Sequence, residues 1–389
     1  MTPMRMGIGW QIGVPSGWGV YGVNLALELA RLGIEPEIFF AQPNIALTPE
    51  QAHVLSSHLS RQPANLAAFR AGPVRLGAPM LHALGDKLDL PDQLAGLGGV
   101  PDIGIVFFES TQIPPANIEK AKRFAAIVAG SAWNAEVLQG HGLQSVRNCP
   151  QGVDLELFKP GPKLGRFASR FAVFSGGKLE YRKGQDLVVA AFKQFYQRHS
   201  DALLVTAWHN PWPQAAKSLG MSTHTTSAPE TGADGRLNVA AWLNANGLPS
   251  ESFVDLGALQ NAQTPNVLRE VDVALFPNRC EGGTNLVAME AMACGVTTIL
   301  SNNTGHHDLI RHDNCYALDM QLPIGALTGR KDLEGWGEST IDEIVSKLES
   351  AYADRDDRLM RGVAANNFMK DWGWSSQIGR LVAAISEFT

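Results

Sequence analysis

Short apolar stretches alternate with longer stretches of helical periodicity along most of this sequence. The first series runs through an apolar stretch at 6–14, a helical pattern at 20–33 and a second apolar stretch at 36–43. A comparable series begins with the apolar stretch at 171–177. A strand, a crossover helix and a following strand build a parallel sheet. Two such series predict an α/β protein with two Rossmann-like, doubly wound domains.

The length of the chain agrees with two domains, since 389 residues exceed one ordinary domain. A segment rich in proline and glycine, 152–165, has the composition of a linker. We expect an N-terminal domain over 1–157, a C-terminal domain over 158–371, and a helix over 372–389 that crosses back to the first domain. The polar segment 214–236 is expected to be a surface excursion.

Composition excludes several classes of protein. The formal charge of −6 gives no basic field for nucleic acid. No apolar run approaches the length of a membrane span, and the N-terminus lacks the apolar core of a signal peptide. The four cysteines form no C-x-x-C pair, which favours reduced thiols in the cytoplasm. They are Cys149, Cys280, Cys294 and Cys315.

The most informative segment is FPNRCEGGTNLVAMEAMACG, residues 276–295. An apolar strand ends at Pro277, a glycine-rich loop carries Glu281, and a helix begins near Asn285 and contains Glu290. Free backbone amides and the dipole at a helix N-terminus suit a phosphate, and the two glutamates can accept hydroxyl hydrogen bonds. An ordinary helix end with solvated glutamates is the alternative.

A second polar segment, FSGGKLEYRKG, follows the first strand of the second series. It places Lys178, Arg182 and Lys183 at the end of a strand and before a helix. Cations at that point can neutralise a diphosphate as its charge develops. Solvated surface charges are the alternative.

Two doubly wound domains suggest a ligand cleft between them, at the carboxyl ends of their strands. Three weaker features are candidates for this cleft. Gly17 and Gly19 precede the first helix without a G-x-G-x-x-G pattern, which argues against a dinucleotide oxidoreductase and leaves simple turn glycines as an alternative. Glu109 follows an apolar strand and is either a general base or a structural or acceptor-binding carboxylate. Of His306 and His307, at most one is expected to face the cleft, and the histidines show no metal-site spacing.

The segment 276–295 resembles the signature of the retaining glycosyltransferases of family 4, which have the GT-B fold of two facing Rossmann-like domains with a cleft between them. Eight residues separate the two glutamates here and seven in the family, so we place an inserted residue before Leu286. The resemblance assigns the donor sugar to Glu281 and the ribose to Glu290. It assigns the diphosphate to backbone amides near Thr284, Asn285 and Leu286.

The other two glycine and cation motifs fit the same resemblance. Lys183 and the following glycine match a lysine–glycine pair of the family, whereas Lys178 replaces an arginine and loses its bidentate fork. Gly17 and Gly19 correspond to the family's N-terminal glycine loop beside the donor phosphates. The junction beginning at Gly152 resembles the family's interdomain segment.

The resemblance implies a retaining hexosyltransferase that moves a sugar from a nucleoside diphosphate sugar to a hydroxyl acceptor in the synthesis of a glycan or glycoconjugate. It implies no cofactor besides the donor and no obligatory metal, and Asp354-Arg355-Asp356 receives no role. The alternatives are a nucleotide-sugar epimerase of the same architecture and a non-catalytic nucleotide-sugar-binding protein. A basic patch offers weak association with a membrane face or an ordinary solvated helix face. It comprises Lys120, Lys122 and Arg123. The oligomeric state is not indicated.

Overall fold

The chain folds into two compact units in a computed structural model, which describes residues 4–13 and 16–388. The N-terminal unit comprises Met1–Gly152 with Trp372–Thr389, and the C-terminal unit comprises Val153–Asp371. The division after Gly152 falls at the start of the junction motif from which the sequence placed a boundary after residue 157. Each unit has its own sheet and is described separately.

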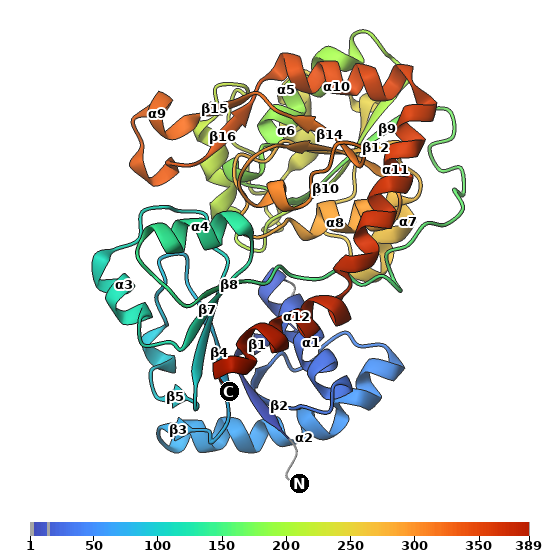
Figure 1. The fold of residues 1–389 in the computed structure, drawn as a ribbon. Helices are drawn as coiled ribbons and strands as arrows, with labels where there is room; N and C mark the ends of the chain where they lie inside the picture. Colours follow the sequence, from blue (N-terminus) through green and yellow to red (C-terminus); the bar gives the residue numbers. More distant parts are fainter. Residues whose placement is uncertain (1–3, 14–15, 389) are drawn as a thin grey trace. The chain divides into compact units, whose positions relative to one another are not determined.

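The N-terminal unit is built on a six-stranded parallel sheet with the order β2-β1-β4-β6-β7-β8 (Figure 1). Its inner strands are mostly apolar and buried, as expected of strands covered on both faces. The strands are β1 (Arg5–Ile12), β2 (Glu35–Ala41), β4 (Met80–Leu84), β6 (Asp102–Val106), β7 (Ala126–Ala129) and β8 (Val146–Asn148). A small parallel pair is formed by β3 (Val74–Arg75) and β5 (Leu97–Gly98).

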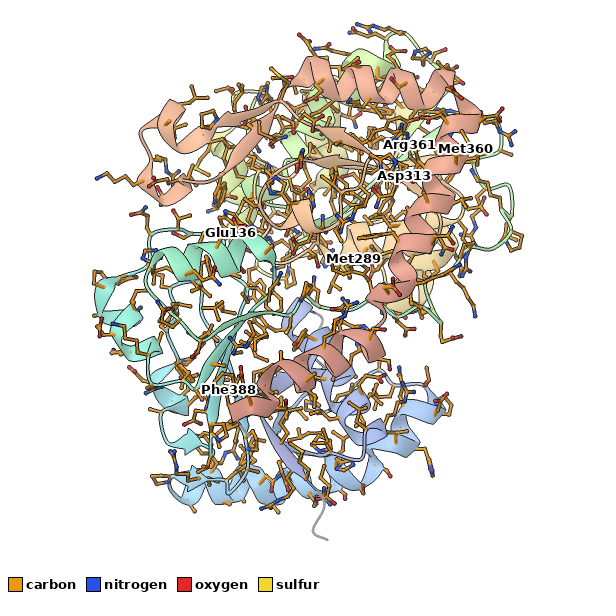
Figure 2. All side chains as sticks on the ribbon, in the orientation of Figure 1. Glu136, Met289, Asp313, Met360, Arg361 and Phe388 are labelled. Carbon is orange, nitrogen blue, oxygen red and sulfur yellow. The ribbon has the colours of Figure 1, made fainter. Side chains whose placement is uncertain are left out.

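Helices connect these strands, and the last helix of the chain belongs to the same unit. The helices are α1 (Gly17–Arg31), α2 (Pro49–Ala71), α3 (Pro115–Ala121), α4 (Ala132–Gly140) and α12 (Trp374–Ile385). The rings of Tyr21 on α1 and Trp374 on α12 meet edge to face at 5.6 Å. A Cβ on Gly152 would come within 2.6 Å of the Trp374 backbone, so glycine there allows α12 to pack closely. Phe388, beyond α12, lies under the Arg147 guanidinium at 5.2 Å (Figure 2).

The C-terminal unit is built on a second six-stranded parallel sheet, with the order β11-β10-β9-β12-β13-β14. Its strands are β9 (Phe171–Lys178), β10 (Ala202–His209), β11 (Phe253–Asp255), β12 (Val273–Phe276), β13 (Thr297–Ser301) and β14 (Cys315–Leu318). The neighbours β9 and β12 come from the two strongest sequence motifs, so their carboxyl ends lie together at one edge of the sheet. That edge positions the site described below.

Helices connect the strands of this sheet and follow its last strand, and the unit also contains a short antiparallel hairpin. The helices are α5 (Gln185–Tyr196), α6 (Val239–Ala245), α7 (Thr264–Leu268), α8 (Leu286–Ala293), α9 (Ile324–Thr328), α10 (Ile341–Ala353) and α11 (Arg355–Met369); the hairpin strands are β15 (Gln321–Pro323) and β16 (Gly337–Ser339). α5 packs beside α10, and α8 packs beside α11 (Figure 1). Met289 on α8 is fully buried in this unit (Figure 2).

The segment expected to be a surface excursion, 214–236, is in part a core element. A 3₁₀ helix, η3 (Pro213–Met221), buries Ala216 and Leu219 completely in the main apolar cluster of the C-terminal unit. Residues three apart share one face of a 3₁₀ helix, so two apolar side chains suffice to anchor a segment that is otherwise polar. The prediction for the first part of this segment is therefore wrong.

Candidate functional site

The loop between β12 and α8 opens at the carboxyl end of the C-terminal sheet. Asn285 ends this loop with φ of 62° and ψ of 90°, and α8 begins at the next residue. Within the part of the chain that the structure describes, no side chain caps the N-terminus of α8. Its first amides therefore lack a side-chain acceptor, which is the condition for binding an anion at a helix end.

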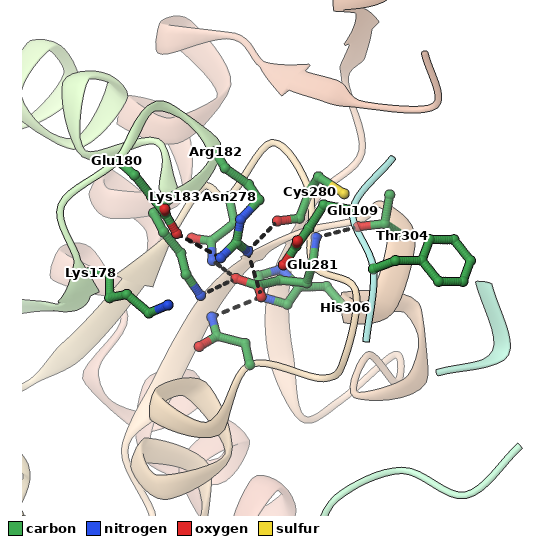
Figure 3. Close-up of polar contacts among 12 residues, drawn as sticks. Glu109, Lys178, Glu180, Arg182, Lys183, Asn278, Cys280, Glu281, Thr304 and His306 are labelled. Atoms are coloured by element: carbon green, nitrogen blue, oxygen red, sulfur yellow. Dashed lines mark hydrogen bonds and ion pairs between the residues drawn. The ribbon is translucent and has the colours of Figure 1, made fainter. Parts of the chain in front are cut away.

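The Glu281 carboxylate is the centre of the site, and three side chains converge on it (Figure 3). Lys183 Nζ donates to Oε1 at 2.5 Å, and Arg182 donates to Oε2 at 3.0 Å. The side-chain amide of Asn278 donates to Oε1 as well. Glu281 is only 4% exposed. A carboxylate with three donors at this depth is held in one place, which suits a group that must meet a ligand in fixed geometry.

The charges of this cluster depend on one another. Burial by itself raises the pKa of Glu281, but the neighbouring Lys183 and Arg182 lower that pKa to about 2. Burial lowers the pKa of Lys183 more than its carboxylate partner raises it. Arg182 also donates to the Glu180 carboxylate at 2.7 Å, so two cations and two carboxylates share a nearly dry site. Their charges balance in the absence of a ligand.

The turn that carries Lys183 has a steric reason for its glycine. The 3₁₀ turn η2 (Tyr181–Lys183) ends at Gly184, whose φ is 68°. A Cβ at Gly184 would lie 2.2 Å from the Pro277 carbonyl oxygen. Glycine lets the turn and the loop after β12 touch, and this contact brings Lys183 to Glu281. The Lys183–Gly184 pair predicted from the sequence is thus close to Glu281.

The loop after β13 holds the Glu281 loop from its other side. The Glu281 amide donates to Thr304 Oγ1 at 2.8 Å, and the Gly305 amide donates to the Glu281 carbonyl at 2.9 Å. A Cβ on Gly305 would lie 1.7 Å from the Gly283 carbonyl oxygen. The two loops are therefore in backbone contact, and the short 3₁₀ segment η6 (Thr304–Asp308) fixes the position of Glu281.

His306 lies inside this contact, whereas His307 is exposed. The side-chain amide of Asn285 donates to His306 Nε2 at 3.0 Å, and His306 Nδ1 lies 3.0 Å from Ser301 Oγ. Because Nε2 accepts, Nδ1 carries the hydrogen. Burial lowers the pKa of His306 to about 4, so the imidazole is neutral near pH 7. His306 thereby orients Asn285, the residue that precedes α8.

Glu290 and Thr284 have different surroundings from Glu281. Glu290 on α8 is half-buried, and desolvation, aided by Asp154, raises its pKa to about 8. Thr284 is completely buried, and its hydroxyl donates to the Met289 sulfur at 3.1 Å. The Thr284 side chain is thus engaged inside the unit. Leu286, the first residue of α8, is half-buried.

Lys178 lies at the end of β9 but does not join the contacts made by Lys183. Its Nζ lies 5.4 Å from the centre of the half-exposed Trp212 ring (Figure 3 shows the lysine). The structure therefore places Arg182, rather than Lys178, beside Glu281. Arg182 stands in the same cationic motif, one residue before Lys183, and this adjacency is the signal that could have selected it. Asn278 and His306 have no comparable local signal.

The predicted residues of the N-terminal unit lie on two loops of that unit. Gly17 begins α1, and the Gly19 amide donates to the Ser16 hydroxyl at 3.3 Å; residues 14 and 15 of that loop lie outside the described residues. Glu109 follows β6, is half-buried, and its amide donates to Asp86 at 2.6 Å. Their roles stay predictions.

The described residues contain neither a candidate metal site nor a candidate membrane-spanning helix. In residues 4–13 and 16–388, no three His, Cys, Asp or Glu side chains are arranged to hold a metal ion. Over the same ranges, no helix has the length and apolar character needed to cross a bilayer. All four cysteines are buried and free.

The relatives found by sequence comparison are glycosyltransferases. Residues 170–321 match the family described as "Glycosyl transferases group 1". The chain is 23% identical to a GDP-mannose-dependent phosphatidylinositol monomannoside mannosyltransferase of Mycobacterium tuberculosis, over 61% of this chain and 54% of that protein. It thus spans about half the length of that relative. It is also 23% identical to a D-inositol 3-phosphate glycosyltransferase of Kineococcus radiotolerans, over 94% and 88% of the two chains.

Solved structures show the same fold. Anabaena HepE in complex with UDP and glucose has a TM-score of 0.67 at 15% identity, with coverage of 99% of this chain and 100% of that chain. Sucrose-phosphate synthase from Thermosynechococcus elongatus has a TM-score of 0.70 at 14% identity, with coverage of 99% and 98%. The predicted α/β fold class and family resemblance are confirmed. The family match, residues 170–321, lies in the C-terminal unit, and the chain shares the GT-B fold of these solved structures.

Proposed function

We propose that this chain is a retaining hexosyltransferase that moves a sugar from a nucleoside diphosphate sugar to a hydroxyl acceptor without a metal ion. One observation carries the proposal: Lys183 and Arg182 meet the buried Glu281 beside the uncapped N-terminus of α8. The relatives support a glycosyl transfer. The substrates in their names suggest a GDP- or UDP-sugar as the donor of this chain and an inositol-type or glycan hydroxyl as its acceptor.

The charges of the site suggest how the donor enters. Without a donor, Glu281 is the counter-ion of Lys183 and Arg182. A diphosphate brings two negative charges to the same lysine and arginine and to the first amides of α8. As these cations turn to the diphosphate, the Glu281 carboxylate gains free acceptor capacity for the hydroxyl groups of the sugar. Binding the donor thereby prepares the carboxylate that orients it.

The same groups then act during transfer. Bond cleavage at the anomeric carbon places negative charge on the departing diphosphate, and Lys183, Arg182 and the α8 amides are already positioned to stabilise it. Glu290, farther along α8, supplies an acceptor for ribose hydroxyls. We keep Lys178 as an additional cation for the diphosphate, Gly17 and Gly19 as donor-loop glycines, and Glu109 as the group that receives the acceptor proton. Retention at the anomeric carbon follows the family resemblance.

Thermal-shift measurements with nucleotides test the donor site. UDP, GDP and ADP, and the matching glucose and mannose conjugates, are added singly to the parent protein. A ligand at 100 times its Kd stabilises the fold by about 2.7 kcal/mol, so the correct donor is expected to raise the Tm clearly above the others. A panel in which no nucleoside diphosphate raises the Tm would contradict the proposal.

Product analysis then separates transfer from the alternatives. The selected donor is incubated with and without inositol phosphate and glycan acceptors, with EDTA present, and the anomeric configuration of the product is read by NMR. Transfer with retention of the anomeric configuration is expected. An epimerised donor in the absence of acceptor would favour an epimerase.

Variants of two buried glutamates complete the test. Glu281→Gln is expected to reduce turnover by about two orders of magnitude. Glu270→Gln is the matched control, because Glu270 is 3% exposed and bonds to the Leu164 and Arg166 amides in a different part of this unit. Equal turnover in Glu281→Gln and the parent would favour a binding protein.

A further inference from the structure

Arg279 is a fully buried arginine, two residues before Glu281. Its guanidinium donates to both oxygens of Asp186, at 2.7 and 2.6 Å, and to the carbonyl of Tyr181 at 2.7 Å. Its Nε donates to Glu338 at 2.7 Å. One side chain thereby joins the turn before α5, the first turn of α5 and the hairpin strand β16.

Backbone hydrogen bonds run through the same residue. The Arg279 amide donates to the Arg182 carbonyl at 2.7 Å, and the Gly337 amide donates to the Arg279 carbonyl at 3.0 Å. The residue on one side of Arg279, Asn278, donates to the Glu281 carboxylate. Arg279 is thus connected by side chain and by main chain to the turn whose two cations meet Glu281.

The two carboxylates around Arg279 have further partners that fix them. Ser222 Oγ donates to Asp186 at 2.6 Å, and His224 Nε2 lies 3.1 Å from Glu338. The Tyr181 ring stacks on the guanidinium, with its centre 3.8 Å from the central carbon. A planar group with this set of partners has little rotational freedom, and lysine could not reproduce its bidentate contact.

We propose that Arg279 is a positioning residue whose buried guanidinium sets the spacing between the turn 181–184 and the loop 278–281. That spacing decides whether Lys183 and Arg182 reach Glu281. Arg279 itself touches neither the carboxylate nor any group that we assign to the donor. The consequence for nucleotide binding depends on the proposed function, whereas the positioning of the two segments does not.

Hydrogen exchange in the absence of any ligand tests the positioning directly. Arg279→Met and Arg279→Lys are compared with the parent, with peptides that cover 179–184 and 278–283 as the readout. We expect Arg279→Met to raise exchange at least about tenfold in both segments, and Arg279→Lys to give a smaller rise in the same two segments. The lysine variant keeps the test decisive if the methionine variant folds poorly.

Arg358→Met is the matched control for the loss of a buried, charged side chain. Arg358 on α11 is 7% exposed, donates to the Ala351 carbonyl and lies 3.7 Å from Asp272. The Arg358→Met variant is expected to have a lower Tm without a selective rise in hydrogen exchange at 179–184 or 278–283. If both Arg279 variants change exchange in these segments no more than Arg358→Met does, the positioning role is overturned.

Calorimetric titration with UDP and with GDP adds the functional arm. Arg279→Lys is expected to bind the nucleotide preferred by the parent about tenfold more weakly, while Arg358→Met binds it as the parent does. A general loss of folded protein would reduce the number of binding sites and leave Kd unchanged, which would contradict the proposal. If the parent binds neither nucleotide, the proposed function fails while the exchange result still decides the role of Arg279.

Discussion

The helices α1 and α8 both begin after a glycine-bearing loop, and their N-termini are built differently. At α1, the Ser16 hydroxyl accepts from the Gly19 amide and serves as the cap. At α8, Asn285 adopts a positive φ, and its side chain contacts His306 instead of capping the helix. The sequence pattern is similar, but of these two helices α8 is the one whose N-cap side chain accepts no hydrogen bond from its first amides.

The surroundings of the two glycine loops differ as well. A Cβ on Gly17 would meet no atom within 4 Å. By contrast, Gly184 and Gly305 are in such close contact with the loop before α8 that a Cβ would collide with its backbone. A glycine before a helix therefore has little meaning by itself. Close backbone contact with neighbouring loops and a missing cap distinguish the end that we propose for the diphosphate.

The largest effect is expected from Gly305→Ala. The new Cβ would lie 1.7 Å from the Gly283 carbonyl oxygen, and backbone cannot move away as a side-chain tip can. We expect the free energy of unfolding to fall by about 3 kcal/mol and nucleotide-induced stabilisation to disappear. Urea denaturation and thermal shift measure the two effects. A variant as stable as the parent would show that the loops before α8 are not rigidly joined.

The second effect compares two lysines near the α8 end. Lys183→Met removes a nearly buried partner of Glu281 and is expected to weaken binding of the preferred nucleoside diphosphate about 100-fold. Lys178→Met removes a cation that rests on Trp212 and is expected to weaken it about threefold. Calorimetry gives both constants. Equal losses would mean that Lys178 contributes as much to the diphosphate site as Lys183.

The third prediction concerns pH and the two glutamates near α8. The pKa of Glu281 is about 2, below an unfolded value of about 4.3, so its contribution to stability is complete above that value and is lost as pH falls to 2. The pKa of Glu290 is about 8, so its ionisation destabilises the fold as pH rises from about 4.3 to 8.

Melting curves from about pH 2.5 to 8.5 measure these opposite slopes. Glu290→Gln is expected to gain Tm relative to the parent as pH rises towards 8. Glu281→Gln is expected to melt below the parent at pH 7, with a smaller difference at about pH 2.5. Parallel curves for Glu290→Gln and the parent would show that Glu290 is not desolvated in the folded protein.

The smallest effects are expected at α1. Ser16→Ala removes the cap and should cost about 1 kcal/mol of stability without changing nucleotide affinity. Gly17→Ala should change the free energy of unfolding by less than about 0.5 kcal/mol, because the added methyl group meets open space. Denaturant titration and calorimetry test both. A large loss of nucleotide binding in Gly17→Ala would support the donor role that we propose for this loop.

The sequence predicted those parts of the fold and site that depend on local pattern. Alternating apolar strands and helices gave both sheets, and the glycine after Lys183 marked the turn that reaches Glu281. Contacts between distant residues were not predictable. Arg279 pairs with Asp186 across 93 positions, and an arginine is usually expected at the surface. The resemblance points to Lys178 because this lysine stands where the family has an arginine. Its contact with Trp212, which comes from another loop, leaves no local signal.

The packing of α12 on α1 has a consequence for synthesis on the ribosome. The first unit contains Tyr21 and Gly152, but their partner Trp374 is translated only after the entire second unit. A nascent chain can assemble the parallel strands of the first sheet early, yet this part of its apolar surface stays uncovered while more than two hundred further residues are added. Chaperone capture during translation is therefore expected at the α1 surface, and a protein cut after Asp371 would keep that surface exposed permanently.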